Sequence, residues 1–182
     1  VLRRMTSLTM FPNTETFIFV KTVKVMKNLF TLCLLVLALF FMGCPYGSEV
    51  AIDDGKAKLE EKLIGKWEAK SSSDYDYIVS KYDETTYKIE KKPRQEGEST
   101  IYYGFLSDLK GTRFLNVWED NENTTRTYYF YKMDLTTSGA KLTLSPVTEN
   151  IKEKFTSSAE LKSFIEKNMA LSFFYSKEDE VY

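Results

Sequence analysis

Between residues 66 and 145 the chain alternates short runs rich in Tyr, Phe, Val, Ile and Thr with clusters of Gly, Asp, Asn and Ser. No other property of the sequence narrows the fold as much, because aromatic and β-branched residues favour strands and the intervening residues favour turns. Strands joined by such short links pair antiparallel. The pattern predicts a mainly β protein, an antiparallel meander that closes into a barrel or half-barrel. Its strands are expected at residues 66–70, 75–82, 85–91, 99–107, 112–118, 125–134 and 140–145.

The distribution of bulky residues indicates how the strands are buried. In the seventh strand Ala140, Leu142 and Leu144 share one face, which predicts burial of that face. Residues 101–106 and 128–131 carry bulk on both faces, so we expect protein on both sides of the fourth to sixth strands. Gly104, in the middle of a strand, predicts a bend or a bulge.

One short helix is expected before the strands. Acidic residues at Asp53 and Asp54 precede Leu59 and Leu63, which are four positions apart, and Gly65 can end a helix in the left-handed conformation.

A second helix is expected near the carboxyl end. Ser157 and Glu160 have the spacing of a capping box, and Leu161, Phe164 and Ile165 form an apolar stripe. This helix should end near Asn168, and residues 170–175 are predicted to form a final aromatic strand.

The amino-terminal part has the layout of a secretory signal peptide. Lys27 is followed by an apolar run from Leu29 to Met42. A helix of that length spans about 21 Å, less than the roughly 30 Å of a bilayer core, which disfavours a transmembrane anchor. Residues 1–25 show no signal pattern, so we expect translation to begin at Met26.

The segment that ends at Phe41-Met42-Gly43-Cys44 resembles the lipobox of bacterial lipoprotein signal peptides. The resemblance implies cleavage after residue 43 and fatty chains, such as palmitate, on Cys44, where more than one chain gives stable membrane anchoring. Residues 44–54 would then be a lipidated linker and residues 55–182 the folded domain. The implied location is the cell envelope, with the outer membrane favoured over the inner; the alternative is a plain signal peptide that happens to end near a cysteine.

The distribution of charge, the absence of histidine and the small number of cysteines exclude several functions. Five of the 25 basic residues precede Cys44, against one of the 26 acidic residues, so the later part is acidic and unsuited to nucleic acid. The chain has no histidine, the usual general base near neutral pH and the usual nitrogen ligand of zinc. If Cys33 is removed with the leader and Cys44 is acylated, no thiol remains for a disulfide. We expect no enzymatic activity, cofactor or metal.

The short helix leading into Gly65-Lys66-Trp67 and the strands that follow resemble the lipocalin-like, or calycin, architecture. The resemblance implies that Trp67 lies across the closed end of a barrel and that the strands enclose a pocket for a small apolar ligand. The alternative is that Trp67 anchors the core of a different small sheet; in both cases it should be buried.

Residues that could bind a ligand are aromatic. The predicted pocket is lined by Trp67, Tyr102, Tyr103, Tyr129 and Tyr131, whose ring faces suit an apolar ligand and whose tyrosine hydroxyls could orient it. The acidic groups of residues 74–76 and 119–122 are expected in solvated turns and not in a metal site.

Two functions remain open. One is a membrane-tethered module that binds a small hydrophobic ligand. The other is a structural or protein-interaction lipoprotein with a filled core, whose partner is another envelope protein. A sizeable interior cavity would favour the first, and a solid core with an exposed apolar patch would favour the second.

Overall fold

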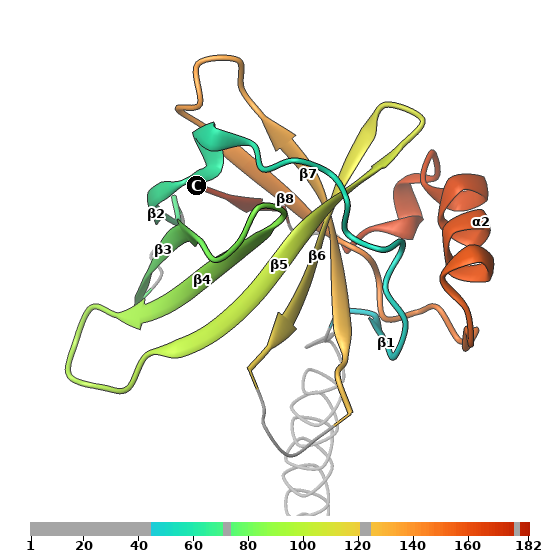
Figure 1. Ribbon diagram of the computed structural model, residues 1–182, viewed down its shortest axis with the longest axis horizontal. Helices are drawn as coiled ribbons and strands as arrows, with labels where there is room; N and C mark the ends of the chain where they lie inside the picture. Colours follow the sequence, from blue (N-terminus) through green and yellow to red (C-terminus); the bar gives the residue numbers. More distant parts are fainter. Residues whose placement is uncertain (1–44, 71–73, 121–124, 177–178) are drawn as a thin grey trace, which may run out of the picture. The chain divides into compact units, whose positions relative to one another are not determined.

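The computed structural model describes residues 45–70, 74–120, 125–176 and 179–182, which belong to one compact unit. A single sheet dominates this unit (Figure 1). Its strands are β1 (Gly47–Ser48), β2 (Gly65–Glu68), β3 (Tyr75–Lys81), β4 (Thr86–Pro93), β5 (Thr100–Leu109), β6 (Thr112–Glu119), β7 (Tyr128–Leu135), β8 (Leu142–Pro146) and β9 (Glu180–Val181). The helices are the 3-10 turns η1 (Glu61–Leu63) and η2 (Ser172–Phe174) and the α-helix α2 (Ser158–Asn168).

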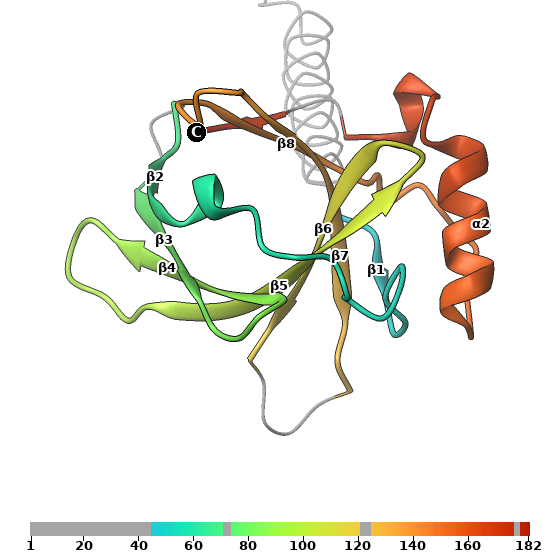
Figure 2. The same cartoon turned by 45° about the horizontal axis from the view of Figure 1, so that its top comes forward.

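The strands form an antiparallel meander. β2 to β9 pair in chain order, and β1 pairs with β7. The sheet curls into a half-barrel, which Figure 2 shows from a second direction. At the seam between its edges, the Lys70 N–H donates to the Val181 carbonyl at 2.8 Å. The seven predicted strands are confirmed as β2 to β8, each within three residues of the expected bounds.

The sheet has a hydrophobic core on each face. The bulky side chains on both faces of residues 101–106 and 128–131 predicted this arrangement. On the concave or inner face the buried residues are Leu63, Trp67, Val79, Tyr87, Ile89, Leu106, Leu115, Met133 and Leu142. On the outer face they are Tyr46, Ile52, Leu109, Phe114, Phe130, Val147, Leu161, Ile165 and Phe174. Helix α2 contributes Leu161 and Ile165 to the outer core and lies outside the curled sheet (Figures 1 and 2).

The short helix expected after Asp53 is not confirmed. Residues 56–60 are irregular, and only the 3-10 turn η1 follows. Tertiary contacts replace the helical bonds: the Glu60 N–H donates to the Tyr87 hydroxyl at 2.5 Å, and the buried Leu63 side chain packs into the inner core.

Residues 44–54 were expected to be a linker, but the described part of this segment is folded. Tyr46 and Ile52 are buried in the outer core, β1 pairs with the start of β7, and the Tyr46 N–H donates to the Val147 carbonyl at 3.0 Å. Burial of two large apolar side chains favours an ordered segment over a flexible one.

Near the carboxyl end one prediction is confirmed and one is wrong. Helix α2 ends at Asn168, and the Ser157 side chain accepts from the Glu160 N–H at 3.3 Å. The expected strand at 170–175 is instead the turn η2 followed by a single bridge from Tyr175 to Val147. Burial of Phe174 in the outer core favours the turn.

Gly104 marks neither a bulge nor a break in pairing. It pairs with Tyr87 on one side and Val117 on the other, in uninterrupted register. A Cβ at this position would lie 3.1 Å from the Asn116 carbonyl oxygen, so glycine relieves crowding between strands.

The predicted leader, the start at Met26, Cys33 and the acylation site Cys44 lie outside the described residues. Within the described ranges no helix has the length and apolar character needed to cross a membrane.

Candidate functional site

The inner face lines an open cavity of about 370 Å³. Small-molecule sites commonly occupy roughly 300 to 1,000 Å³, so this cavity falls at the small end of that range. Its lining residues are Pro45, Leu63, Trp67, Tyr77, Val79, Ile89, Lys91, Tyr102, Leu115, Val117, Glu119, Tyr129, Tyr131, Leu142, Leu144, Glu180 and Tyr182.

The floor of the cavity is apolar. Leu63, Val79, Ile89, Leu115 and Leu142 line it, and each is at most 8% exposed. These residues lie toward the end of the sheet where the segment that carries η1 packs on the inner core. The floor can therefore hold hydrocarbon but offers it no charged group.

The mouth lies at the opposite end, where β3, β5 and β7 begin and β4 and β6 end. Glu119 is the last residue of β6, Lys91 pairs in register with Tyr77 near the end of β4, and Tyr129 is the second residue of β7. Glu119 is exposed, whereas Lys91 is half-buried. Pro45 also lines the cavity.

Five tyrosines, together called the tyrosine belt, also line the cavity. Its members are Tyr77, Tyr102, Tyr129, Tyr131 and Tyr182. The rings of Tyr77 and Tyr182 meet edge to face at 5.3 Å, and the Tyr182 hydroxyl donates to a Glu180 carboxylate oxygen at 2.7 Å.

Three hydroxyls of the belt remain available to a ligand. In the part of the chain that the structure describes, the hydroxyls of Tyr102, Tyr129 and Tyr131 form no hydrogen bond with another residue, and all three residues line the open cavity. A tyrosine hydroxyl is protonated and can donate at neutral pH, and burial raises the pKa of Tyr131 and of Tyr102 further.

The predicted pocket residues separate into two groups. Trp67, Tyr102, Tyr129 and Tyr131 all line the cavity. Trp67 is 8% exposed and its indole N–H donates to the Leu63 carbonyl at 2.8 Å. Tyr103 does not line it: successive strand residues point to opposite faces, and its ring stacks on Trp118 with centroids 5.8 Å apart.

Sequence reasoning missed Tyr77, Lys91 and Tyr182. The first two could have been found, because Trp67 pairs with Tyr77 and Tyr77 with Lys91, and directly paired residues share a face. Tyr182 carries no local signal, since its place depends on pairing of β9 with β8.

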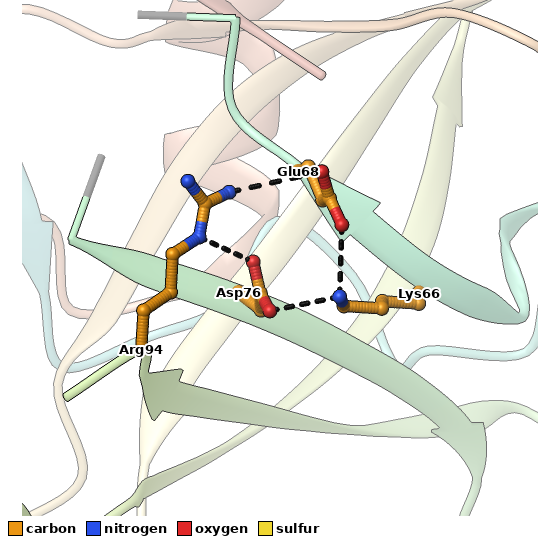
Figure 3. A network of polar contacts seen from close by, with 4 residues as sticks. All are labelled: Lys66, Glu68, Asp76 and Arg94. Carbon is orange, nitrogen blue, oxygen red and sulfur yellow. Dashed lines mark hydrogen bonds and ion pairs between the residues drawn. The ribbon is translucent and has the colours of Figure 1, made fainter. Parts of the chain in front are cut away.

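The acidic residue Asp76 belongs to a strand and not to a turn. Figure 3 shows it in a network that joins β2, β3 and Arg94, the residue after β4. Asp76 lies 2.9 Å from Lys66 and 2.8 Å from Arg94, and Glu68 lies 2.8 Å from Lys66. Hydrogen bonds from Lys66 and then Arg94 hold the pKa of Asp76 below its ordinary value. The described residues contain no group of three or more metal-ligating side chains.

The outer face carries its own aromatic cluster around Trp118. Its rings include Tyr82, Tyr103, Phe105 and Tyr128, and the Arg126 guanidinium lies 4.7 Å from the Trp118 ring. A hollow of about 350 Å³ beside it is lined by Trp118, Glu119, Asp120, Thr125, Arg126, Thr127 and Tyr129. Because charged and hydroxyl side chains predominate, this hollow lacks the apolar floor of the inner cavity.

Comparison of the chain with protein-family models, with characterised proteins and with solved structures found no significant match in any of the three.

Proposed function

We propose that this chain is a lipid-anchored lipoprotein of the bacterial envelope that binds one small hydrophobic or amphipathic molecule in a lipocalin-like half-barrel. The observation that carries the proposal is the inner cavity, in which an apolar floor is combined with lining tyrosine hydroxyls that form no hydrogen bond within the described residues. Binding sites of this kind use apolar walls for affinity and a few polar groups for orientation.

The cavity volume limits the ligand. A cavity of about 150 Å³ can hold benzene, so 370 Å³ has room for on the order of 15 carbon atoms. This corresponds to a single hydrocarbon chain or a small fused-ring molecule. The charged groups at the mouth, Lys91 and Glu119, leave the polar end of such a molecule near water.

The proposed location comes from the lipobox resemblance at Cys44, and the absence of histidine from the whole sequence supports a binding role over catalysis. Intact-mass measurement of the protein extracted from membranes tests the anchor. The expected mass is that of a chain beginning at an acylated Cys44; an unmodified cysteine or a retained leader would overturn the anchor.

Filling the cavity tests ligand binding. Leu144→Trp places a large ring on the inner face of β8, and Thr143→Trp places the same ring at the adjacent position, which points to the other face. A fluorescent fatty acid should bind the wild type and Thr143→Trp with similar affinity. It should bind Leu144→Trp at least about tenfold more weakly, a loss of about 1.4 kcal/mol. Equal affinity for both variants would overturn the proposal.

A protein-interaction role is the second candidate, and the outer aromatic cluster favours it. Tyr82 is 61% exposed and packs on Tyr103 with ring centroids 4.8 Å apart. Aromatic side chains beside an arginine are enriched at protein interfaces. If Tyr82→Ala abolished recovery of a cross-linked envelope protein while Leu144→Trp did not, this role would replace ligand binding.

A further inference from the structure

The chain enters the fold at the mouth of the cavity. Pro45 lines the cavity, and two residues later Gly47 pairs with Tyr129, another lining residue. A Cβ on Gly47 would lie 3.4 Å from the Tyr129 ring, which places this start of the fold directly against the cavity wall.

This entry point is held firmly. Tyr46 is 6% exposed, its N–H donates to the Val147 carbonyl at 3.0 Å, and its hydroxyl donates to the Glu153 carbonyl at 2.9 Å. The segment from Tyr46 onward therefore supplies no slack between the folded unit and whatever precedes Pro45.

The short covalent connection between Pro45 and the proposed anchor limits how far the mouth can lie from a membrane. Cys44 is bonded to Pro45, and the apolar run ends at Met42, three residues before Pro45. Three residues extend at most about 11 Å. An acylated Cys44 would therefore bring the bilayer surface to within that reach of Pro45, which lines the cavity.

We infer that the ligand is a single-chain amphiphile that enters the cavity tail first, directly from the bilayer to which the protein is tethered. The inference rests on the proposed function. Transfer across a mouth held at the surface lets the hydrocarbon move from lipid to the apolar floor with little exposure to water. The polar end of the amphiphile would remain beside Lys91, Glu119 and the tyrosine belt.

A linker insertion tests the inference. About 20 Gly and Ser residues inserted between Cys44 and Pro45 have an r.m.s. length of about 25 Å, enough to release the mouth from the surface. The matched control carries the same insertion after Ser138, in the exposed turn between β7 and β8 at the floor end. The full chain, reconstituted in phosphatidylethanolamine vesicles, is mixed with a fluorescent fatty acid dissolved in the same bilayer, and energy transfer from tryptophan reports its uptake.

The Cys44 linker should slow uptake from the bilayer about five-fold, since the effective concentration of lipid at the mouth falls. The Ser138 insertion should leave the rate unchanged, and both variants should bind fatty acid added from solution with wild-type affinity. Equal rates with intact affinity would overturn the inference and leave the proposed function standing. If the wild type itself did not bind fatty acid added from solution, both the inference and the proposed function would be overturned. Faster uptake by the linker variant would also overturn the inference, because it would mean that the acyl chain of Cys44 itself fills the wild-type cavity.

Discussion

Asn116 is a fully buried polar side chain in the middle of β6. Its Oδ1 accepts from the Ile52 N–H at 3.1 Å, and its Nδ2 donates to the Ser107 hydroxyl at 2.9 Å. One amide therefore attaches the segment after β1 to the outer face of the sheet. Nothing in the sequence identified this role, because the contact with Ile52 joins residues 64 positions apart.

Asn116→Leu should destabilise the protein by about 2–3 kcal/mol, because it leaves the buried Ile52 N–H and the Ser107 hydroxyl without their partner. Urea denaturation measures the loss. Ser107→Ala is the control and should cost only about 1 kcal/mol, since the Asn116 Nδ2 can still donate to the Phe105 carbonyl. Equal losses in the two variants would contradict this account.

Tyr87 is buried at the floor end and bonds to the backbone of Glu60 through its hydroxyl. Burial raises its pKa to about 12, above the ordinary value near 10. A raised pKa in the folded state means that the stabilisation is complete below pH 10 and is lost as the pH rises through 12. Alkaline conditions should therefore release the segment around Glu60.

Tyr87→Phe removes this titrating group. The variant should be less stable than the wild type by about 1–2 kcal/mol at neutral pH, because the Glu60 N–H loses its acceptor. Its unfolding free energy should fall less steeply than that of the wild type between pH 10 and 12. Denaturant melts at several pH values check this, and parallel pH profiles would show that Tyr87 does not titrate as described.

At the level of elements, the strands could be predicted and the shortest elements could not. β2 to β8 have local signals, since each combines aromatic or β-branched residues with a flanking turn. β1 and β9 are two residues long and exist through pairing with β7 and β8, which no local pattern reveals. The prediction of a helix at Leu59 and Leu63 was wrong. The four-residue spacing of these leucines occurs in a largely irregular segment, in which the Glu60 N–H donates to the Tyr87 hydroxyl and not to a helical carbonyl.

The lining residues of the candidate site could be predicted only where the sequence shows which face of the sheet a side chain occupies. Tyr102 and Tyr103 are adjacent aromatic residues in a strand buried on both sides, so composition could not tell which one faces inward. Only the register, which pairs Tyr102 with Ile89 and Glu119, assigns Tyr102 to the cavity and Tyr103 to the outer cluster.

The close approach of β5 to its neighbours depends on Gly104. Gly104→Val should destabilise the protein by about 1–3 kcal/mol, because the new side chain meets the Asn116 carbonyl, Leu115 and Ile89 within 3.4 Å. Thermal unfolding measures the change. Gly97→Ala, on an exposed turn where the added methyl contacts only Pro93 within 4 Å, is the control and should change the midpoint little. A Gly104→Val variant as stable as the control would contradict tight packing there.

At the scale of the molecule, one sheet separates two cores, and the two can be perturbed separately. Residues at the outer core hold α2 and the segment around β1, whereas the inner core forms the cavity floor. The seam between β8 and β2 belongs to the inner side alone: β9 pairs with β8, Tyr182 packs on Tyr77, and the Val181 carbonyl accepts from Lys70.

Deleting residues 180–182 should therefore open the cavity and spare the outer core. The loss of Tyr182 burial and of its two backbone hydrogen bonds with Leu142 should cost about 3 kcal/mol. Affinity for a fluorescent fatty acid should fall at least about tenfold, while amide exchange in α2 stays close to wild type. Tyr182→Phe, which keeps the ring and the backbone pairing but removes the bond to Glu180, separates the hydroxyl from the strand and should retain most of the affinity. If instead the deletion unprotected α2 and the cavity together, the two cores would form one cooperative unit, and ligand binding would be coupled to the whole fold and not to the seam alone.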